Sequence, residues 1–480
     1  MNSPIRRLTL ALLIGFCLLL ANVVYIQAVA ADRYRSDHRN ARVQLARSER
    51  ERGVMVDRSG AVLVSSEGQA STFLRTYPFG DLLGHPIGFS SLLFGDRGLE
   101  AAYATDLRSK QDLTISNVIA GILGNDLRPA NLRLTIDVAL QQVAAEALGD
   151  QVGAVVAIEP STGAILAYVS TPGFDPALLI GGEAGPAGDT LDADPAEPLR
   201  DRVVNQLYAP GSIFKIVTTA AALESGEITV ESTFSNPTAL ALPGSESTIS
   251  NADGHTCGSG AEVSLARGFV LSCNTTFAQI AMTLGAGALE AQAEAFGFGS
   301  EIPFVFPVAE SMFSPVDLAD DLPALAQTSI GQRDVRVTPL HMALMVAGIA
   351  NRGDLMSPYL VSEIIDGDGQ IVTTTQPAPW RKASSESTAL AITQLMVDAV
   401  NSGTGAGARI DGVQVAGKTG TAENPDQAPH AWFVGFAPAD QPTIAIAVVV
   451  EFGGLAGDEA SGGQTAAPIA QKTMERWLKP

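Results

Sequence analysis

Residues 208–224 read YAPGSIFKIVTTAAALE, and this stretch places one lysine, Lys215, inside an otherwise apolar segment. Pro210 and Gly211 predict a turn, and Ser212 can open a helix as its cap, because its side chain can accept a hydrogen bond from a free backbone N–H. The residues that follow are small or apolar, so the helix is expected to pack inside a domain. A buried ammonium is costly unless it is paired or loses its proton. Lys215 therefore requires a functional explanation.

Ser212 and Lys215 form an S-x-x-K motif. Residues three positions apart lie on one face of a helix, so the lysine can reach the serine hydroxyl. Serine is a poor nucleophile unless a base takes its proton, and a lysine kept partly neutral by burial and a nearby cation can be that base. The alternative is a lysine on a half-buried helix with its ammonium in water. The apolar neighbours Ile213, Phe214 and Ile216 favour the catalytic interpretation.

An S-x-N motif follows at Ser272, Cys273 and Asn274. Ser272 can relay a proton between Lys215 and a leaving amine, and the Asn274 amide can hold a substrate backbone. The alternative is an ordinary helix cap, which the same residue types favour.

A K-T-G motif followed by a hydroxyl residue occupies residues 418–421, that is Lys418, Thr419, Gly420 and Thr421. Gly420 would let a substrate peptide approach the backbone and pair as an added strand. Lys418, Thr419 and Thr421 would bind a carboxylate, and Lys418 is also a candidate for the cation that keeps the first lysine neutral. The alternative is a loop of turn-forming residues. Each motif alone is weak evidence, but the three in this order predict a serine acyl-transfer site.

Apolar runs on both sides of the motifs predict one sheet. Five strands are expected, at residues 153–158, 164–169, 413–421, 431–437 and 443–452, with the first two joined as a hairpin. A helix over residues 134–148, with Asp137 near its start, precedes the sheet, and an amphipathic helix over 464–478 closes the chain. The predicted fold class is α/β of the α+β type: a five-stranded antiparallel sheet packed by helices, and not a Rossmann fold.

The segment before this body is predicted to be a charged stalk and a small α+β domain. Residues 52–60 indicate a short strand that leads into a turn at Ser59 and Gly60. Residues 181–200 are acidic and rich in Gly and Pro, so a mobile loop is expected there.

Residues 8–31 carry no charge and are long enough to span a bilayer as a helix. Arg6 and Arg7 favour a cytoplasmic N-terminus. A cleaved signal peptide is the alternative, since residues 28–30 fit an A-x-A cleavage pattern, but the apolar stretch is longer than a usual signal core. Either way the chain after residue 32 is exported. The predicted domains are a cytoplasmic tail (1–7), a transmembrane anchor (8–31), a stalk and pedestal (32–130) and the catalytic domain (131–480).

The charge of the chain bears on its possible partners, and its cysteines bear on the compartment in which it folds. The chain has 30 Lys and Arg against 51 Asp and Glu, a net charge of −21, which argues against nucleic acid as a partner. Cys17 lies in the apolar N-terminal run, whereas Cys257 and Cys273 can form a disulfide outside the cytoplasm. Two separate buried thiols are the alternative. The motif regions are poor in His, and we expect no metal and no cofactor.

The motif set resembles that of the penicillin-binding proteins and serine β-lactamases. The wider match is to class B penicillin-binding transpeptidases, most like the actinobacterial penicillin-binding protein A group, and it covers most of residues 50–478. The catalytic-domain segments that carry it are residues 134–137, 140–141, 154–158, 162–167, 329–332 and 337–340; those of the family's N-terminal pedestal are residues 52–53, 57–60 and 98–100.

This resemblance implies a peptidoglycan D,D-transpeptidase. Ser212 would attack the D-Ala-D-Ala carbonyl of a stem peptide and release the terminal D-Ala, and an amine of a neighbouring stem would take the acyl group. The family's oxyanion hole would use the backbone N–H groups of Ser212 and Thr421, and β-lactam antibiotics would acylate the same serine. The resemblance also implies a single-pass plasma-membrane protein with an extracytoplasmic catalytic domain, acting beside a SEDS-type glycosyltransferase in wall synthesis and division.

Three alternatives stay open from the sequence. A D,D-carboxypeptidase or a β-lactamase would have the same fold, because water and an amine compete for one acyl-enzyme. A membrane-tethered scaffold with a degenerate pocket would bind partners without chemistry. Against the scaffold, the chain keeps every motif residue intact, namely Ser212, Lys215, Ser272, Asn274, Lys418 and Thr419.

Overall fold

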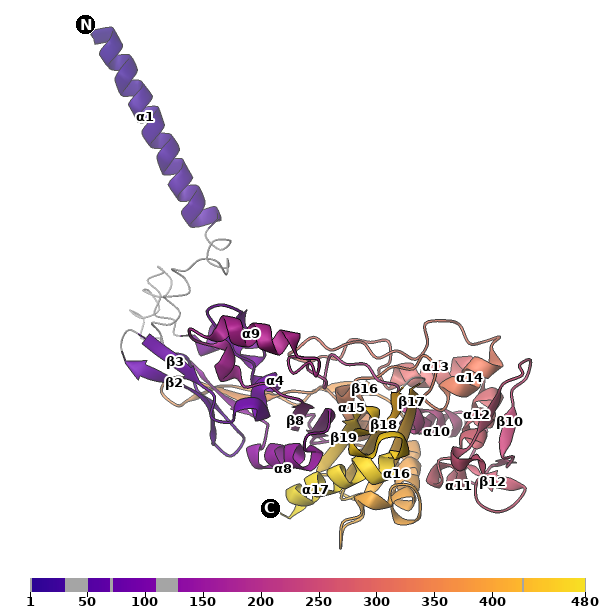
Figure 1. Cartoon of the computed structure of the whole chain (residues 1–480). Coiled ribbons are helices and arrows are strands. Elements are labelled where there is room, and N and C mark those ends of the chain that lie inside the picture. The colour runs from indigo at the N-terminus through magenta and orange to yellow at the C-terminus, as the bar shows by residue number, and fades with distance from the viewer. Residues whose placement is uncertain (1, 31–50, 70–71, 109–127, 425–426, 480) are drawn as a thin grey trace.

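The computed structural model describes residues 2–30, 51–69, 72–108, 128–424 and 427–479. Its N-terminal helix α1 spans Asn2–Val24 and continues through a π turn, Tyr25–Val29 (Figure 1). Within it, Pro4–Gln27 is long and apolar enough to cross a membrane, and none of this span is buried against the rest of the protein. An apolar helix with no protein partner in the described chain fits a hydrocarbon environment. The span begins earlier than residue 8, and residue 31 lies outside the described residues.

The catalytic body is built on one five-stranded sheet in the order β17-β18-β19-β7-β8. The strands are β7 (Gly153–Ile158), β8 (Ile165–Thr171), β17 (Ala416–Asn424), β18 (Gln427–Ala437) and β19 (Ile444–Val450), and every neighbouring pair is antiparallel. The predicted fold is therefore confirmed. The bounds of the β17–β18 hairpin were wrong, since β17 begins after Val415 and β18 begins at Gln427 rather than at Ala431.

Alternate residues of the central strands face two different apolar cores, as the two-residue period of a strand requires. Val156 faces the core that includes α15 (Pro339–Ala350), whereas Val155 faces the core shared with α8 (Val138–Leu148) and α17 (Ala467–Leu478). Both faces of the sheet are thus covered, with α8 and α17 packed against each other on one side. Coverage on both faces explains why the strands read as continuous apolar runs.

The helix predicted over residues 134–148 begins later than expected. Asp137 is its N-cap, and its carboxylate accepts a hydrogen bond from the Leu140 N–H at 3.0 Å, so α8 starts at Val138. The preceding residues, Asn131–Leu134, form strand β6 of a second sheet. The closing helix also starts later, at Ala467, after a π turn over Gly462–Ala466.

Most of the helices and short strands inserted between β8 and β17 add to the body around the sheet, whereas α9 lies over the pedestal (Figure 1). The insert helices are α9 (Ala184–Ala193), α10 (Lys215–Glu224), α11 (Leu265–Val270), α12 (Asn274–Leu284), α13 (Ala286–Ala295), α14 (Leu322–Thr328), α15 and α16 (Glu386–Ser402). Its short strands are β9 (Thr233–Ser235), β10 (Ala239–Ala241), β11 (Thr248–Ser250), β12 (Glu262–Ser264), β13 (Asp354–Met356) and β16 (Pro379–Lys382).

The pedestal is organised around a six-stranded sheet in the order β15-β14-β6-β1-β2-β3. Its strands are β1 (Met55–Val56), β2 (Val62–Gln69), β3 (Thr72–Thr76), β6, β14 (Val361–Ile365) and β15 (Ile371–Thr374). Two of these strands come from far down the chain, so the sheet uses residues from both sides of the predicted boundary at residue 130. The turn at Ser59 and Gly60 is present, closed by hydrogen bonds from the Ser59 and Ala61 N–H groups to the Asp57 carboxylate at 2.8 Å.

Two sequence segments that carried the pedestal resemblance meet at one buried carboxylate. Glu100 is fully buried and accepts hydrogen bonds from Arg52 at 2.5 Å and Arg75 at 2.6 Å. Removing one partner of such a buried charge group is strongly destabilising, because it leaves an uncompensated charge in the interior. The cluster joins Arg52 to the short helix α5 (Leu99–Ala102), whereas most of the predicted stalk, residues 32–50, lies outside the described residues.

The prediction of a mobile loop over residues 181–200 was wrong, because α9 forms there. Gly188 of α9 faces the turn between β4 (Ser90–Ser91) and β5 (Gly95–Asp96). A Cβ added to Gly188 would collide with the Phe94 ring in that turn. The small residues that suggested disorder are therefore what allow this helix to pack against the pedestal.

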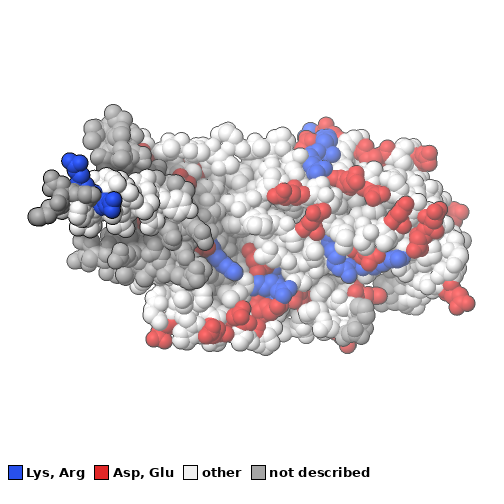
Figure 2. Space-filling view, turned by 90° about the horizontal axis from the view of Figure 1, so that it is seen from above, with Lys and Arg blue, Asp and Glu red and all other residues white. Residues whose placement is uncertain are grey.

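One face of the molecule shows how the charged side chains are distributed over its described residues. Figure 2 shows acidic side chains scattered across the visible face, with isolated basic groups between them and no extended basic area on it. This distribution is typical of a solvated acidic surface.

Candidate active site

Ser212 lies in a 3₁₀ turn, Gly211–Phe214, that leads directly into α10. The prediction that Ser212 caps the helix was wrong, since Pro210 occupies the N-cap position and makes no side-chain cap bond. The turn is fixed by its surroundings instead. Gly211 has φ +55° and donates its N–H to the Gly331 carbonyl at 2.9 Å, and a Cβ on Gly211 would lie 2.5 Å from the Thr421 carbonyl oxygen. Only glycine fits between the two segments, so the serine is held against the K-T-G strand.

The segment that leads into this turn is anchored by buried polar contacts that could not be predicted from the sequence. The Tyr208 hydroxyl donates to the Glu451 carboxylate at 2.6 Å, and Arg202 donates to the same oxygen at 2.9 Å. Tyr208 also exchanges two backbone hydrogen bonds with Val337 at 2.9 Å. No local signal links residues so distant in sequence. The result is a rigid approach to the Ser212 turn.

Lys215 is the first residue of α10 and is fully buried. Its Nζ lies 2.7 Å from the Ser272 carbonyl oxygen, 2.7 Å from Asn274 Oδ1 and 3.3 Å from Ser272 Oγ. Within the described residues its hydrogen bonds all go to the S-x-N motif, and the expected bond to the Ser212 hydroxyl is not among them. Burial, and secondarily the nearby Lys418, lower the pKa of Lys215 well below its ordinary value.

Ser272 occupies a strained backbone conformation, with φ +62°. Such a conformation costs about 1–3 kcal/mol for a residue other than glycine and persists only where neighbours enforce it. Here the Ser272 N–H donates to the Phe269 carbonyl at 3.1 Å and the Cys273 N–H to the Gly268 carbonyl at 2.8 Å. The strain places the Ser272 hydroxyl 2.9 Å from Lys418 Nζ and 3.3 Å from Lys215 Nζ. One hydroxyl therefore links two buried lysines.

The K-T-G residues lie on β17, at the edge of the sheet. Lys418 is fully buried, and burial lowers its pKa to about 7. Gly420 packs on the serine turn, since a Cβ there would be 2.7 Å from the Pro210 carbonyl oxygen and 2.8 Å from Ile213 Cγ1. An edge strand leaves backbone groups available for an added strand. Thr421 pairs with Ala431 of β18 and lies next to the turn of Ser212.

Both polar groups of the Asn274 amide already have partners within the protein. The oxygen accepts from Lys215, and the nitrogen donates to the Ser250 carbonyl of β11 at 2.9 Å. A substrate backbone would therefore have to share or replace one of these bonds. Asn274 is also the first residue of α12, so the helix fixes its position.

Thr404 was missed by the sequence analysis. Its hydroxyl lies 2.6 Å from the Thr419 hydroxyl, in the loop after α16. Flanking glycines mark that loop in the sequence, but they do not indicate that its threonine lies beside the K-T-G motif.

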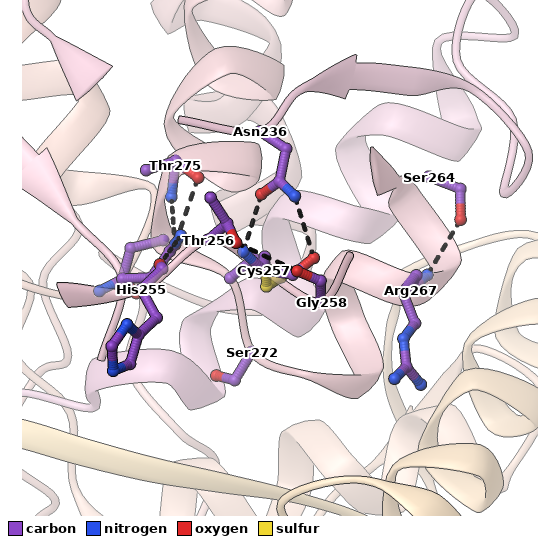
Figure 3. Close-up of a disulfide and its surroundings, with 12 residues drawn as sticks. Asn236, His255, Thr256, Cys257, Gly258, Ser264, Arg267, Ser272 and Thr275 are labelled. Atoms are coloured by element: carbon purple, nitrogen blue, oxygen red, sulfur yellow. Dashed lines mark hydrogen bonds between the residues drawn. A yellow bond between two sulfur atoms is a disulfide. The ribbon is translucent and has the colours of Figure 1, made fainter. Parts of the chain in front are cut away.

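Cys257 and Cys273 are joined by a disulfide, with their Cα atoms 5.8 Å apart (Figure 3). Cys273 is the central residue of the S-x-N motif. Cys257 is held in turn by Asn236, which accepts from the Cys257 N–H at 2.8 Å and donates to its carbonyl at 3.2 Å. The bridge therefore ties the Ser272 segment to a loop outside the helical core.

Thiol titration of the denatured, non-reduced full-length chain is expected to detect one thiol, that of Cys17, which is free and exposed on α1. Reduction before denaturation should raise the count to three, the number of cysteines in the sequence. Three reactive thiols without reduction would contradict the bridge. A chain in which Cys17 is replaced by serine is the matched control, with an expected count of zero.

Known proteins share both parts of this architecture. The family profile described as "Penicillin binding protein transpeptidase domain" matches residues 153–475, and "Penicillin binding protein A dimerisation domain" matches residues 52–132. The chain is 41% identical over 498 residues to a protein of Mycolicibacterium smegmatis named "Peptidoglycan D,D-transpeptidase PbpA", covering 100% of this chain and 99% of the relative. A protein of the same name from Mycobacterium tuberculosis is 40% identical over 496 residues, with the same coverage.

A solved structure of penicillin-binding protein A from M. tuberculosis, a ceftriaxone acyl-enzyme complex, superposes with a TM-score of 0.84 at 39% identity. The superposition covers 91% of this chain and 100% of that one. A penicillin G acyl-enzyme complex of the same protein gives a TM-score of 0.82. The fold and domain order of the chain are those of these proteins.

Proposed function

We propose that Ser212 is the acylated nucleophile of this chain. The chain belongs to the class B penicillin-binding proteins and is similar over its full length to the penicillin-binding protein A group. The chain is a serine-type peptidoglycan D,D-transpeptidase that β-lactams acylate. The assignment of the catalytic residues rests on one observation. Two buried lysines, Lys215 and Lys418, both contact the Ser272 hydroxyl beside the turn that holds Ser212.

The contacts of Lys215 support its role as the base. A neutral amine has two N–H groups and one lone pair, and the two acceptors at 2.7 Å occupy both N–H groups. The lone pair then faces the third contact, the Ser272 hydroxyl at 3.3 Å, and can accept a proton from that hydroxyl or from the Ser212 hydroxyl. Burial and the Lys418 charge both favour the neutral form.

The reaction proceeds in two balanced steps. Lys215 takes the proton of Ser212 as its oxygen attacks the carbonyl carbon of the penultimate D-Ala, and the backbone N–H groups of Ser212 and Thr421 stabilise the oxyanion. The C–N bond then breaks as Ser272 gives its proton to the departing D-Ala amine and receives the proton held by Lys215, so that both return to their starting forms. In the second step the amine of a neighbouring stem attacks the ester carbonyl and loses a proton to Lys215, the C–O bond to Ser212 breaks, and that proton returns to the Ser212 oxygen.

Substrate binding is assigned to the K-T-G strand. The stem peptide would add to the edge of β17, with Asn274 holding its backbone. Lys418, Thr419 and Thr421 would bind the terminal carboxylate, and Gly420 would allow the close approach.

The test of this function is product analysis with the full-length chain in detergent. A donor peptide ending in D-Ala-D-Ala is mixed with an amine acceptor, and cross-linked and hydrolysed products are separated by mass. Cross-linked product together with a long-lived penicillin adduct supports transpeptidation. Hydrolysis alone would make the chain a carboxypeptidase, and rapid turnover of penicillin would make it a β-lactamase. No product and no adduct on folded protein would favour the non-catalytic scaffold.

The pH dependence of acylation follows from the two lysines. Acylation efficiency with penicillin is expected to rise with pH as Lys215 loses its proton, and to fall above about pH 7 as Lys418 loses the charge that binds the carboxylate. Rapid-quench mass spectrometry across the pH range measures the profile. Penicillin methyl ester, which lacks the carboxylate, serves as the control and should lose the alkaline limb. Efficiency that keeps rising to about pH 9 would show that the Lys418 charge is not required.

The membrane arrangement is also a proposal. We infer that the apolar span Pro4–Gln27 is a retained anchor in the plasma membrane and that everything after residue 32 is extracytoplasmic. The anchor and pedestal would contact a SEDS-type glycosyltransferase during wall synthesis at division. Support comes from the exposed apolar helix, from the disulfide, which fits an oxidising compartment, and from the resemblance to the family.

A further inference from the structure

Thr404 presents a hydroxyl at the K-T-G strand from a part of the chain that none of the three motifs includes. It lies in the loop between α16 and the short 3₁₀ turn Ala406–Ala408, and its side chain is exposed. Its hydroxyl is 2.6 Å from that of Thr419, whose side chain is buried. An exposed polar group joined to a buried one at the substrate strand is placed to meet a ligand.

The backbone of Thr404 is fixed although its side chain is exposed. The Gly403 and Gly405 N–H groups both bond to the Ala399 carbonyl at the end of α16, at 3.1 and 3.0 Å. Gly463 packs against the other side of the Thr404 backbone. A Cβ added to Gly463 would collide with the Thr404 carbonyl oxygen and would lie 3.8 Å from Thr419 Cγ2. The Thr404 hydroxyl is therefore held in place beside the K-T-G motif, as a preorganised binding group must be.

The pair of hydroxyl groups has one proton to offer a ligand. Each hydroxyl carries one proton and can accept bonds, and the bond between them uses one of the two protons. If Thr404 donates to Thr419, the Thr419 proton is free; if the direction is reversed, the Thr404 proton is free. A hydrogen-bonded chain also polarises its terminal donor, which strengthens a bond to an anion. The Lys418 side chain lies beside the backbone of the same residue, with Nζ 3.1 Å from the Thr419 carbonyl oxygen, and in its protonated form it adds positive charge to this part of the strand.

We propose that Thr404 is a carboxylate-binding residue that works as a pair with Thr419 and selects substrates ending in a free carboxylate. This inference rests on the proposed function of the K-T-G strand and extends its carboxylate site to a residue outside the three motifs. The pair discriminates against donors whose terminal carboxylate is esterified or amidated, because its free proton then faces a weaker acceptor.

The test compares acylation of the full-length chain by penicillin G and by penicillin G methyl ester, followed by intact mass. Replacing Thr404 with valine keeps the branched shape and removes the hydroxyl. This change is expected to slow acylation by penicillin G roughly tenfold, the value of one hydrogen bond to a charged group, and to change acylation by the ester less than about twofold. Thr404→Ser should restore the preference for the acid.

Thr393→Val is the matched control, since Thr393 lies on α16, the helix that precedes the loop of Thr404, and within the described residues its hydroxyl donates to the Ala389 carbonyl at 2.9 Å. If Thr404→Val slows acylation by penicillin G and by its methyl ester equally, Thr404 has a structural role only and the proposal is overturned. No slowing with either probe would also overturn it. Failure of the wild-type chain to react with penicillin G would instead overturn the proposed function itself. The two failures are thus distinguishable.

Discussion

Replacing Ser212 with alanine is expected to abolish the penicillin adduct of the full-length chain completely. The adduct is an ester of the Ser212 oxygen, and alanine offers no atom that can form it. The change removes one half-buried hydroxyl from a turn held by Gly211 and Gly331, so the fold should persist. Intact mass after incubation with penicillin G measures the result directly.

Ser247→Ala is the control for this experiment, because Ser247 is exposed in the loop between β10 and β11. It should form the adduct as fast as the wild-type chain. An adduct of unchanged mass in Ser212→Ala would place the nucleophile elsewhere. Thermal unfolding of both variants verifies that loss of the adduct is not loss of the fold.

Much of the fold could be predicted because the central strands are buried on both faces. Strand β7 was predicted at its observed bounds, since an unbroken apolar run between turn residues has few other interpretations. Helix starts were less predictable. Residues 134–137 look like the beginning of α8, but Leu134 pairs with Val361 in the pedestal sheet, and no local pattern shows a partner so far away.

Helix α9 is a case in which the local composition of the sequence predicts the wrong structure. Its Gly and Pro content favours a loop, and the helix exists because its small residues fit against the Phe94 turn of the pedestal. Tertiary packing here overrides local propensity. Nothing in residues 181–200 alone carries that information.

The catalytic motifs could be found from sequence because their spacing is local. Their relative geometry could not, because it depends on a strained residue and on distant partners. Ser272 resembles a helix cap in the sequence, whereas in the structure its left-handed backbone turns its hydroxyl between Lys215 and Lys418. Thr404 lacks any motif, and only its 2.6 Å contact with Thr419 shows its relevance.

Lys215→Arg is expected to slow acylation by penicillin on the order of a thousandfold, within the range that general bases contribute. Arginine keeps a positive charge at the position but does not deprotonate in proteins, so it cannot take the proton of Ser212. Rapid-quench mass spectrometry measures the acylation rate, and thermal unfolding verifies that the longer side chain is accommodated. Lys382→Arg is the matched control, because Lys382 is exposed and paired with Asp354 at 2.9 Å, and its rate should not change.

An acylation rate within tenfold of the wild type in Lys215→Arg would contradict the assignment of the base. The remaining candidate would then be Lys418, whose pKa of about 7 makes it partly neutral near pH 7 and which contacts Ser272 Oγ at 2.9 Å. In that case Lys418→Arg would be the variant that loses acylation, and the proton of Ser212 would travel through Ser272. If Lys215 is the base, Lys418→Arg keeps the charge that binds the carboxylate, and its loss should be much smaller. Measuring both variants therefore decides which of the two buried lysines removes the proton.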